Sequence, residues 1–287
     1  MNPTFLVLAS LSPNTERAAH YAAALGAPLP ARLALLHLYH DPLLDPELVT
    51  VTTAGAYRSQ AAVAADLRAL AAHLPVPATV TVSVQGLSEA VREAVGRTAP
   101  LLLAMGLSTE HDALDHLLHN QALPALRATH RPLLLVPEAA PAPRVPGRVV
   151  VAIDAEPFRP NAAARALAPL LAAWQAAYTV AHITAPGERQ AYPGQRALGQ
   201  LRMSGLLPPT TPLELYEEHN LPPAAGILQA LDETRADLLV LIARPRSFLG
   251  RLFHRSITAK VLRHSRVPVL LLPVEAPEIP DWMPSLG

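Results

Sequence analysis

Four arginines between residues 244 and 255 are the first candidates for binding chemistry in the sequence. They are Arg244, Arg246, Arg251 and Arg255, and Ser256 follows directly. A guanidinium group donates parallel hydrogen bonds that suit the oxygens of a phosphate. The cluster therefore predicts an anion-binding loop. A solvated helix face, or pairing with acidic groups of the partner half, is the alternative.

Asp154 is the acidic candidate nearest to that chemistry. It follows the apolar run 149–153, which is typical of a buried strand. Its carboxylate could receive an adenine amino group or a ribose hydroxyl. It could equally cap a turn at the end of the strand, as aspartates often do. The sequence leaves both roles open.

A group of histidines and aspartates between residues 111 and 119 suggests a metal site. It contains His111, Asp112, Asp115, His116 and His119. His116 and His119 are three residues apart and could share one face of a helix. Their spacing matches no metal-binding motif, and a polar helix face explains them more simply. We therefore expect no metal.

The motifs of common hydrolases and of nucleotide-binding phosphate loops are missing. The sequence has no Gly-x-Ser-x-Gly, no His-Glu-x-x-His and no Gly-Lys-Ser/Thr. Cysteine is absent, which excludes disulfides and thiol chemistry. Asp154 lacks an acid/base partner. We expect a protein that is not an enzyme, with weak ATPase activity as the open alternative.

Composition narrows the class of protein further. The 287 residues carry no formal net charge, so there is no overall electrostatic case for binding nucleic acid or an anionic membrane. The N-terminus lacks the basic region of a secretory signal, and no apolar stretch reaches membrane-spanning length. We expect a soluble, cytoplasmic protein.

The elements that would position these residues alternate between strand and helix. Predicted strands cover residues 5–9, 32–38, 78–84, 101–105, 132–136, 148–154, 178–183, 212–216, 238–242 and 267–272. Predicted helices cover 13–25, 46–74, 89–97 (capped by Ser88), 160–177, a reduced helix within 187–207, a helix from 222, and 248–264. The alternation predicts an α/β fold with doubly wound parallel sheets.

The second half of the chain repeats the first. The segment 100–137 is repeated as the segment 237–273, and each reads as strand, loop, helix and strand. We therefore expect a first domain over 1–138, a proline-rich linker over 139–147, a second domain over 148–274 and a tail over 275–287.

The repeated segment also carries a family resemblance. Asp237-Leu-Leu-Val-Leu, then Arg244, Arg251-Leu-Phe, Ser256, Lys260-Val-Leu-Arg-His and Val267-Pro-Val-Leu resemble the C-terminal signature of universal stress protein (UspA-type) domains. The resemblance covers both halves. It implies two five-stranded, Rossmann-like domains of the adenine nucleotide α-hydrolase type. It also implies that they pack as an intramolecular pseudo-dimer through the fifth strand, 132–136.

Members of that family that bind nucleotides hold adenine with a first-strand aspartate and with backbone after the second strand. A Gly-rich loop and the start of the fourth helix hold the phosphates. Here Ile242, Pro245 and Arg255 replace the loop glycines of the second half. In the first half only one of these glycines remains, and Ser10 replaces the aspartate.

Carried onto this chain, the family pattern gives two sets of candidate ligand-binding residues. The second half contributes Asp154, Ile183, Arg244, Arg246, Arg255 and Ser256. The first half contributes the weaker set Ser10, Leu38, Gly106, Thr109 and Asn120. His37 and His182, near the ends of matching second strands, are expected to be structural or to line the crevice.

The resemblance implies a tandem universal stress protein that acts as a non-enzymatic stress-response binding or interaction module. The alternative is a switch that binds ATP or AMP in the second domain, with slow ATP hydrolysis. A pure scaffold for a protein partner is a third interpretation. A homodimer and a protein partner are compatible with the sequence, and neither nucleic acid nor a membrane is expected.

Overall fold

The computed structural model describes residues 2–39, 59–108, 118–187, 191–244 and 257–275. The predicted group of His111 and His116, and the candidates Thr109, Arg246, Arg255 and Ser256, lie outside these residues. Among the helices of the described part of the chain, none is long and apolar enough to cross a membrane.

The first half alternates five strands with helices. Its strands are β1 (Thr4–Ala9), β2 (Arg32–Leu38), β3 (Ala78–Ser83), β4 (Leu102–Leu107) and β5 (Leu133–Pro137). Its helices are α1 (Pro13–Gly26), α3 (Gln60–His73), α4 (Leu87–Thr98), the π-helix η1 (Leu118–Ala122) and α6 (Leu123–Thr129).

The second half repeats this order. Its strands are β6 (Arg148–Ala152), β7 (Ala177–Thr184), β8 (Leu213–His219), β9 (Leu238–Ala243) and β10 (Val269–Pro273). Its helices are α7 (Ala162–Arg165), α8 (Ala168–Ala173), α9 (Pro193–Met203), α10 (Pro223–Thr234) and α12 (Ile257–His264).

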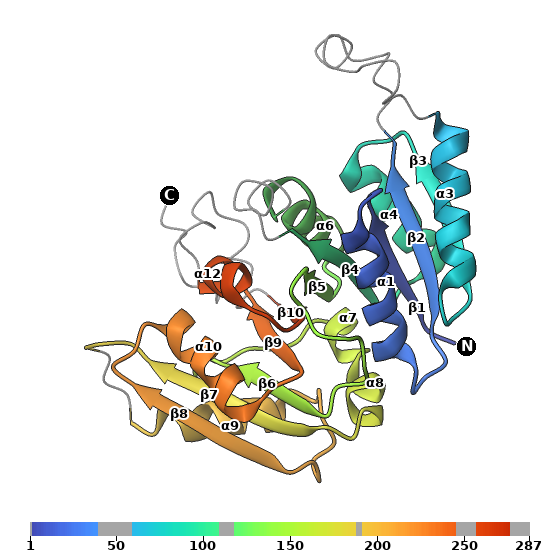
Figure 1. The fold of residues 1–287 in the computed structure, drawn as a ribbon. Helices are drawn as coiled ribbons and strands as arrows, with labels where there is room; N and C mark the ends of the chain where they lie inside the picture. Colours follow the sequence, from blue (N-terminus) through green and yellow to red (C-terminus); the bar gives the residue numbers. More distant parts are fainter. Residues whose placement is uncertain (1, 40–58, 109–117, 188–190, 245–256, 276–287) are drawn as a thin grey trace, which may run out of the picture.

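The ten strands form one sheet in the order β3-β2-β1-β4-β5-β10-β9-β6-β7-β8. Strands within each half are parallel, and only the central pair is antiparallel, with Leu134 opposite Leu270. The fifth strands of the two halves therefore join them, as the resemblance implied. Figure 1 shows the two halves side by side along this sheet. The predicted α/β pseudo-dimer is confirmed.

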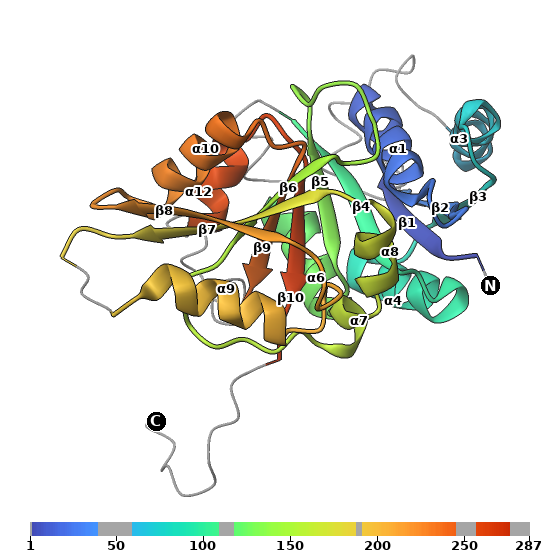
Figure 2. The same ribbon diagram turned by 90° about the horizontal axis from the view of Figure 1, so that it is seen from below.

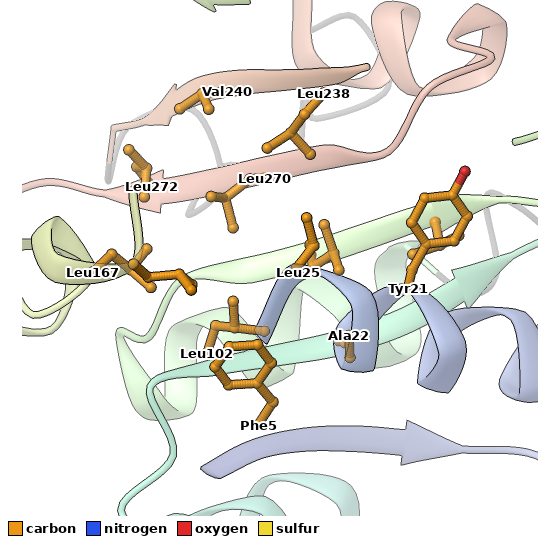
Figure 3. Packing of buried hydrophobic residues seen from close by; sticks show 14 of the residues in the cluster. Phe5, Tyr21, Ala22, Leu25, Leu102, Leu167, Leu238, Val240, Leu270 and Leu272 are labelled. Carbon is orange, nitrogen blue, oxygen red and sulfur yellow. The ribbon is translucent and has the colours of Figure 1, made fainter. Parts of the chain in front are cut away.

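Helices cover both faces of the sheet (Figure 2). One core cluster lies under α1, α3, α7, α8 and α9, and the other under α4, α6, α10 and α12. The first cluster runs without a break from one half into the other. Figure 3 shows Phe5 and Leu25 from the first half in the same cluster as Leu238 and Leu270 from the second. The core is thus shared between the halves.

Three predicted helices differ from the observed ones. The helix predicted over 160–177 is wrong, because it is divided into α7 and α8, and Pro169 stands in the first turn of α8. Proline lacks the N–H that a continuous helix needs there. Helix α4 begins at Leu87 with Gly86 at its N-cap, so the predicted cap by Ser88 is wrong. Of the helix predicted over 46–74, the described part is α3, which begins only at Gln60.

Candidate functional site

The crevice of an open parallel sheet lies at the carboxyl ends of its strands, where the strand order reverses. In the second half that point lies between β6 and β9. Asp154 follows β6 and Arg244 follows β9, so the fold brings these two predicted residues together. Arg244 donates from Nε to Asp154 Oδ2 at 3.1 Å and from Nη2 to Asp154 Oδ1 at 2.6 Å. The pair is a bidentate salt bridge across the crevice.

The guanidinium of Arg244 has further partners in the loop after β6. Its Nη1 donates to the carbonyl oxygen of Pro157 at 2.9 Å, and its Nη2 to that of Glu156 at 2.8 Å. A guanidinium carries five N–H donors, so these bonds and the two to Asp154 leave at most one free. Only 12% of the Arg244 side chain is exposed, against 50% for Asp154. Arg244 is therefore held by the protein rather than presented to solvent.

Asp154 also forms a hydrogen bond within the loop after β6. Its Oδ1 also accepts a hydrogen bond from the backbone N–H of Glu156 at 3.1 Å, as a turn-capping aspartate does. The residue between them, Ala155, has a φ of 57°, in the left-handed region. The structure thus shows the turn-capping role that the sequence left open. Arg244 pairs with an acidic group of its own half, whereas the alternative stated from the sequence was pairing with the partner half.

The two strand-end histidines make the same contact in both halves. His37 Nδ1 donates to the carbonyl oxygen of Ala9, and His182 Nδ1 to that of Ile153, each at 2.8 Å. A carbonyl oxygen only accepts, so the proton must be on Nδ1 in both rings. Each histidine ties the end of its second strand to the end of the first strand. This agrees with the expected structural role.

Ile183, the predicted backbone site of the second half, lies near the end of β7. Its side chain is buried, and a Cβ added to Gly226 of α10 would come within 2.6 Å of it. The residue therefore packs tightly under α10. Its side chain belongs to the core beneath the crevice.

Sequence reasoning missed two polar side chains on the opposite face of β7. Thr184 shares the α9-covered face of β7 with Val180 and His182, because residues two apart in a strand point to the same side, and Gln200 lies in α9 itself. Gln200 Nε2 donates to the carbonyl oxygen of Ala155 at 2.7 Å. Thr184 Oγ1 and Gln200 Oε1 are buried and have no hydrogen-bond partner among the described residues. The spacing of His182 and Thr184 was the available signal.

In the first half, Ser10 stands where the second half has Asp154. Its backbone N–H donates to Thr15 Oγ1 at 2.7 Å, and its hydroxyl contacts the hydroxyls of Ser12 at 2.7 Å and Thr15 at 3.1 Å. Thr15 in turn donates to the carbonyl oxygen of Ser10 at 2.7 Å. These bonds join the end of β1 to the first turn of α1. The hydroxyl group of Ser10 is thus part of a local network.

Gly106 lies inside β4, which corrects its predicted place in a loop. A Cβ at this position would lie 2.3 Å from the backbone oxygen of Asn14. The glycine is required because the start of α1 packs directly on β4. Leu38 ends β2, and Asn120 is an exposed residue of η1.

The described residues contain no group of three or more histidine, aspartate or glutamate side chains that could hold a metal ion. Most of the loop after β9, where the family holds phosphates, lies outside the described residues. Ile242 belongs to β9, and Arg244 fills the space beyond it with its own hydrogen bonds. Pro245, next in the chain, has no N–H to donate. In sequence, Ile242 and Pro245 do not fit the family's use of glycines to hold phosphates.

Comparison with known proteins agrees with this architecture. A universal stress protein family model matches residues 147–273. A universal stress protein from Archaeoglobus fulgidus DSM 4304 is similar in structure, with a TM-score of 0.58 and 18% identity over 96% of this chain and 97% of that chain. A putative universal stress protein from Pseudomonas aeruginosa UCBPP-PA14 has a TM-score of 0.55 and 14% identity over 94% of this chain and 93% of that chain.

A functionally unknown protein from Pseudomonas aeruginosa PAO1 also matches, with a TM-score of 0.55 and 13% identity over 96% of this chain and 93% of that chain. A search of curated proteins gave no match. At these identities the structural likeness shows the fold alone. The second half of the chain therefore belongs to the universal stress protein family, and the two halves together share the fold of full-length structures of that family.

Proposed function

We propose that this universal stress protein is a non-enzymatic binding or interaction module whose second crevice is closed by its own side chains. The bidentate salt bridge between Arg244 and Asp154 carries the proposal. The carboxylate that would receive adenine or ribose is already paired. The arginine that would bind phosphate already donates hydrogen bonds to Asp154, Glu156 and Pro157.

The first crevice supports the same proposal. Ser10 offers no carboxylate, and its hydroxyl is engaged with Ser12 and Thr15. Gly106, the remaining glycine of the family pattern, is used for the contact between α1 and β4. A protein with both crevices filled would act through its surface. Binding of a protein partner should then be unaffected by Asp154→Ala or Arg244→Ala.

Nucleotide binding is the test that separates this proposal from an ATP- or AMP-binding switch. The purified protein is denatured, the released small molecules are identified by mass spectrometry, and ATP, ADP and AMP are titrated into the native protein by calorimetry. We expect that no nucleotide is released and that ATP is not hydrolysed. Any heat of binding at millimolar nucleotide should be the same for the wild type and for Asp154→Ala.

The matched variants are Asp154→Ala and, as a control, Arg202→Ala on the exposed side of α9. Adenine nucleotide binding that Asp154→Ala weakens and Arg202→Ala leaves unchanged would overturn the proposal. It would show that Arg244 releases the carboxylate when ligand arrives, and would make the second half a nucleotide sensor.

A further inference from the structure

A groove of about 580 Å³ lies at the other edge of the second half, at the amino ends of β6, β9 and β10. This volume is in the usual range for sites that bind small molecules. The groove lies between the linker, α10 and the chain that follows α12. Its charged lining consists of Arg144, Arg148, Arg235, Arg266, Asp232 and Asp237, together with His264. Four arginines against two aspartates leave an excess of positive charge, in a chain whose formal net charge is zero.

One of the four arginines, Arg144, is already paired with an aspartate. Asp237 forms an ion pair with Arg144 and accepts hydrogen bonds from the backbone N–H groups of Gly147 and Arg148 at 2.8 and 2.9 Å. The Nε of Arg148 donates to the carbonyl oxygen of Arg235 at 2.7 Å. The carboxylate of Asp237 is therefore neutralised by the linker and does not compete for the remaining cations.

Two guanidinium groups of the groove are unengaged. The side chains of Arg235 and Arg266 are exposed and make no hydrogen bond or ion pair within the part of the chain that the structure describes. Arg148 adds the two Nη groups that its bond to Arg235 leaves over. Guanidinium groups that converge on one groove can together hold an anion with several oxygens.

The first half provides an internal comparison for these arginines. The strand registers show which positions of the two halves correspond. Thr4 begins β1 opposite Arg32 of β2, as Arg148 begins β6 opposite Ala177 of β7. Leu133 of β5 pairs with Leu103 of β4, as Val269 of β10 pairs with Leu239 of β9. Thr4 is thus the equivalent of Arg148. His130, three residues before Leu133, is the equivalent of Arg266, three residues before Val269.

The third arginine has its equivalent at a helix end. The C-cap residue of α4 is Ala99 and that of α10 is Arg235, and both are in the left-handed conformation, with φ of 41° and 50°. Arginine near a helix C-terminus can serve simply to bind the last carbonyls. Because α4 ends in the same way on an alanine, the fold does not require Arg235 for this purpose. At all three positions the first half has a residue other than arginine.

We propose that this groove binds a small phosphorylated molecule. Arg235 and Arg266 hold the phosphate oxygens, and Arg148 contributes its free Nη groups. Leu228, Leu231 and Val267 line the same groove and take an apolar part of the ligand. The site lies at the amino ends of the strands, so it is separate from the crevice of Asp154 and Arg244 and does not depend on the function proposed above.

The test replaces the two unengaged arginines by the residues that the first half carries at the same positions. The variant Arg235→Ala, Arg266→His keeps side chains that this fold already accepts there, and at pH 8 a histidine of ordinary pKa is neutral. Pyrophosphate is titrated into the full chain by calorimetry at low and at physiological ionic strength. We expect the wild type to bind it, and the double variant to bind it at least tenfold more weakly.

Two controls locate the site. Arg202→Ala removes an exposed arginine from α9, and Asp154→Ala alters the crevice; both should leave pyrophosphate affinity within about twofold, because neither residue lines the groove. Absence of heat with millimolar pyrophosphate, or equal affinity of the double variant and the wild type, would overturn the proposal. Loss of binding in Asp154→Ala would assign the anion to the crevice instead.

A second titration tests the apolar part of the ligand. Phenyl phosphate should bind more tightly than inorganic phosphate, because its ring can pack against Leu228, Leu231 and Val267. Equal affinities would show that the groove recognises the phosphate alone and would remove the apolar contact from the proposal. Thermal unfolding of each variant checks that the chain is folded during the titrations.

Discussion

Arg244 and Asp154 join the ends of two neighbouring parallel strands at the point where the strand order reverses, with Nη2 of the arginine 2.6 Å from Oδ1 of the aspartate. In the first half the same two positions are Ser108 and Ser10, so this ion pair has no counterpart there. The two halves have the same fold but differ in how their crevices are filled. In the second half an ion pair joins the two strand ends, and in the first half two serines stand at the same positions.

The first prediction concerns the strength of that contact. Asp154→Asn, Arg244→Gln and the double variant form a double-mutant cycle, measured by urea unfolding. Because half of the Asp154 side chain is exposed, we expect a coupling of about 1 kcal/mol rather than the larger value of a buried pair. Strictly additive effects of the two changes would contradict a direct interaction in solution.

The second prediction separates the packing role of Gly106 from a ligand role. Gly106→Ala should lower the free energy of unfolding by about 1–3 kcal/mol, because its Cβ would collide with the backbone of Asn14. Gly199→Ala in α9 is the matched control, since nothing lies within 4 Å of the added carbon. It should raise the free energy by about 0.5–1 kcal/mol through helix propensity. Equal effects of the two changes would remove the packing explanation.

Apolar periodicity and the internal repeat were enough to predict the strands, and the family resemblance implied the join between the halves. The runs 132–136 and 267–272 read as strands buried on both faces, and β5 and β10 meet in the centre of the sheet. The break between α7 and α8 was also in the sequence, as Pro169 within a helical pattern.

The content of the crevice could not be predicted in the same way. Asp154 and Arg244 are 90 residues apart, and for each of them the sequence left a ligand-binding role and a structural role open. Whether a carboxylate meets a ligand or an arginine of its own chain depends on side-chain geometry that spacing does not encode. Gly106 presents the same ambiguity, because a glycine can admit either a phosphate or a neighbouring helix.

The third prediction concerns the contact between the helices of the two halves. Trp174 Nε1, at the end of α8, donates to the carbonyl oxygen of Leu25 in α1 at 2.9 Å, in a buried environment. Trp174→Phe keeps the aromatic ring but leaves this carbonyl without its donor, so we expect a loss of about 1–3 kcal/mol in urea unfolding. Tyr192→Phe, at an aromatic residue that is 81% exposed, is the control and should change little. An unchanged Trp174→Phe variant would show that the bond adds nothing to the association.

The last prediction follows from Asp237, which the sequence identified only as the start of the family signature. Its side chain is 8% exposed, and it receives Arg144 and the backbone N–H groups of Gly147 and Arg148. Burial alone would raise the pKa of Asp237, but these hydrogen bonds outweigh it and hold the pKa below the ordinary value. The carboxylate therefore fastens the linker to the start of β9.

A carboxyl group whose pKa is lowered by folding adds stability above its unfolded pKa of about 3.9, and this contribution is lost as the pH falls through the lower, folded value. Asp237→Asn should therefore lower the free energy of unfolding by a constant amount of about 1–3 kcal/mol between pH 5 and 7. The difference from the wild type should shrink below about pH 4, where the wild-type carboxyl group is protonated too. Asp232→Asn, at an exposed carboxylate of α10 without a hydrogen bond to the described residues, is the control and should have little effect throughout. A difference for Asp237→Asn that persists unchanged into strong acid would mean that the linker is held by packing, and that the charge of Asp237 contributes nothing.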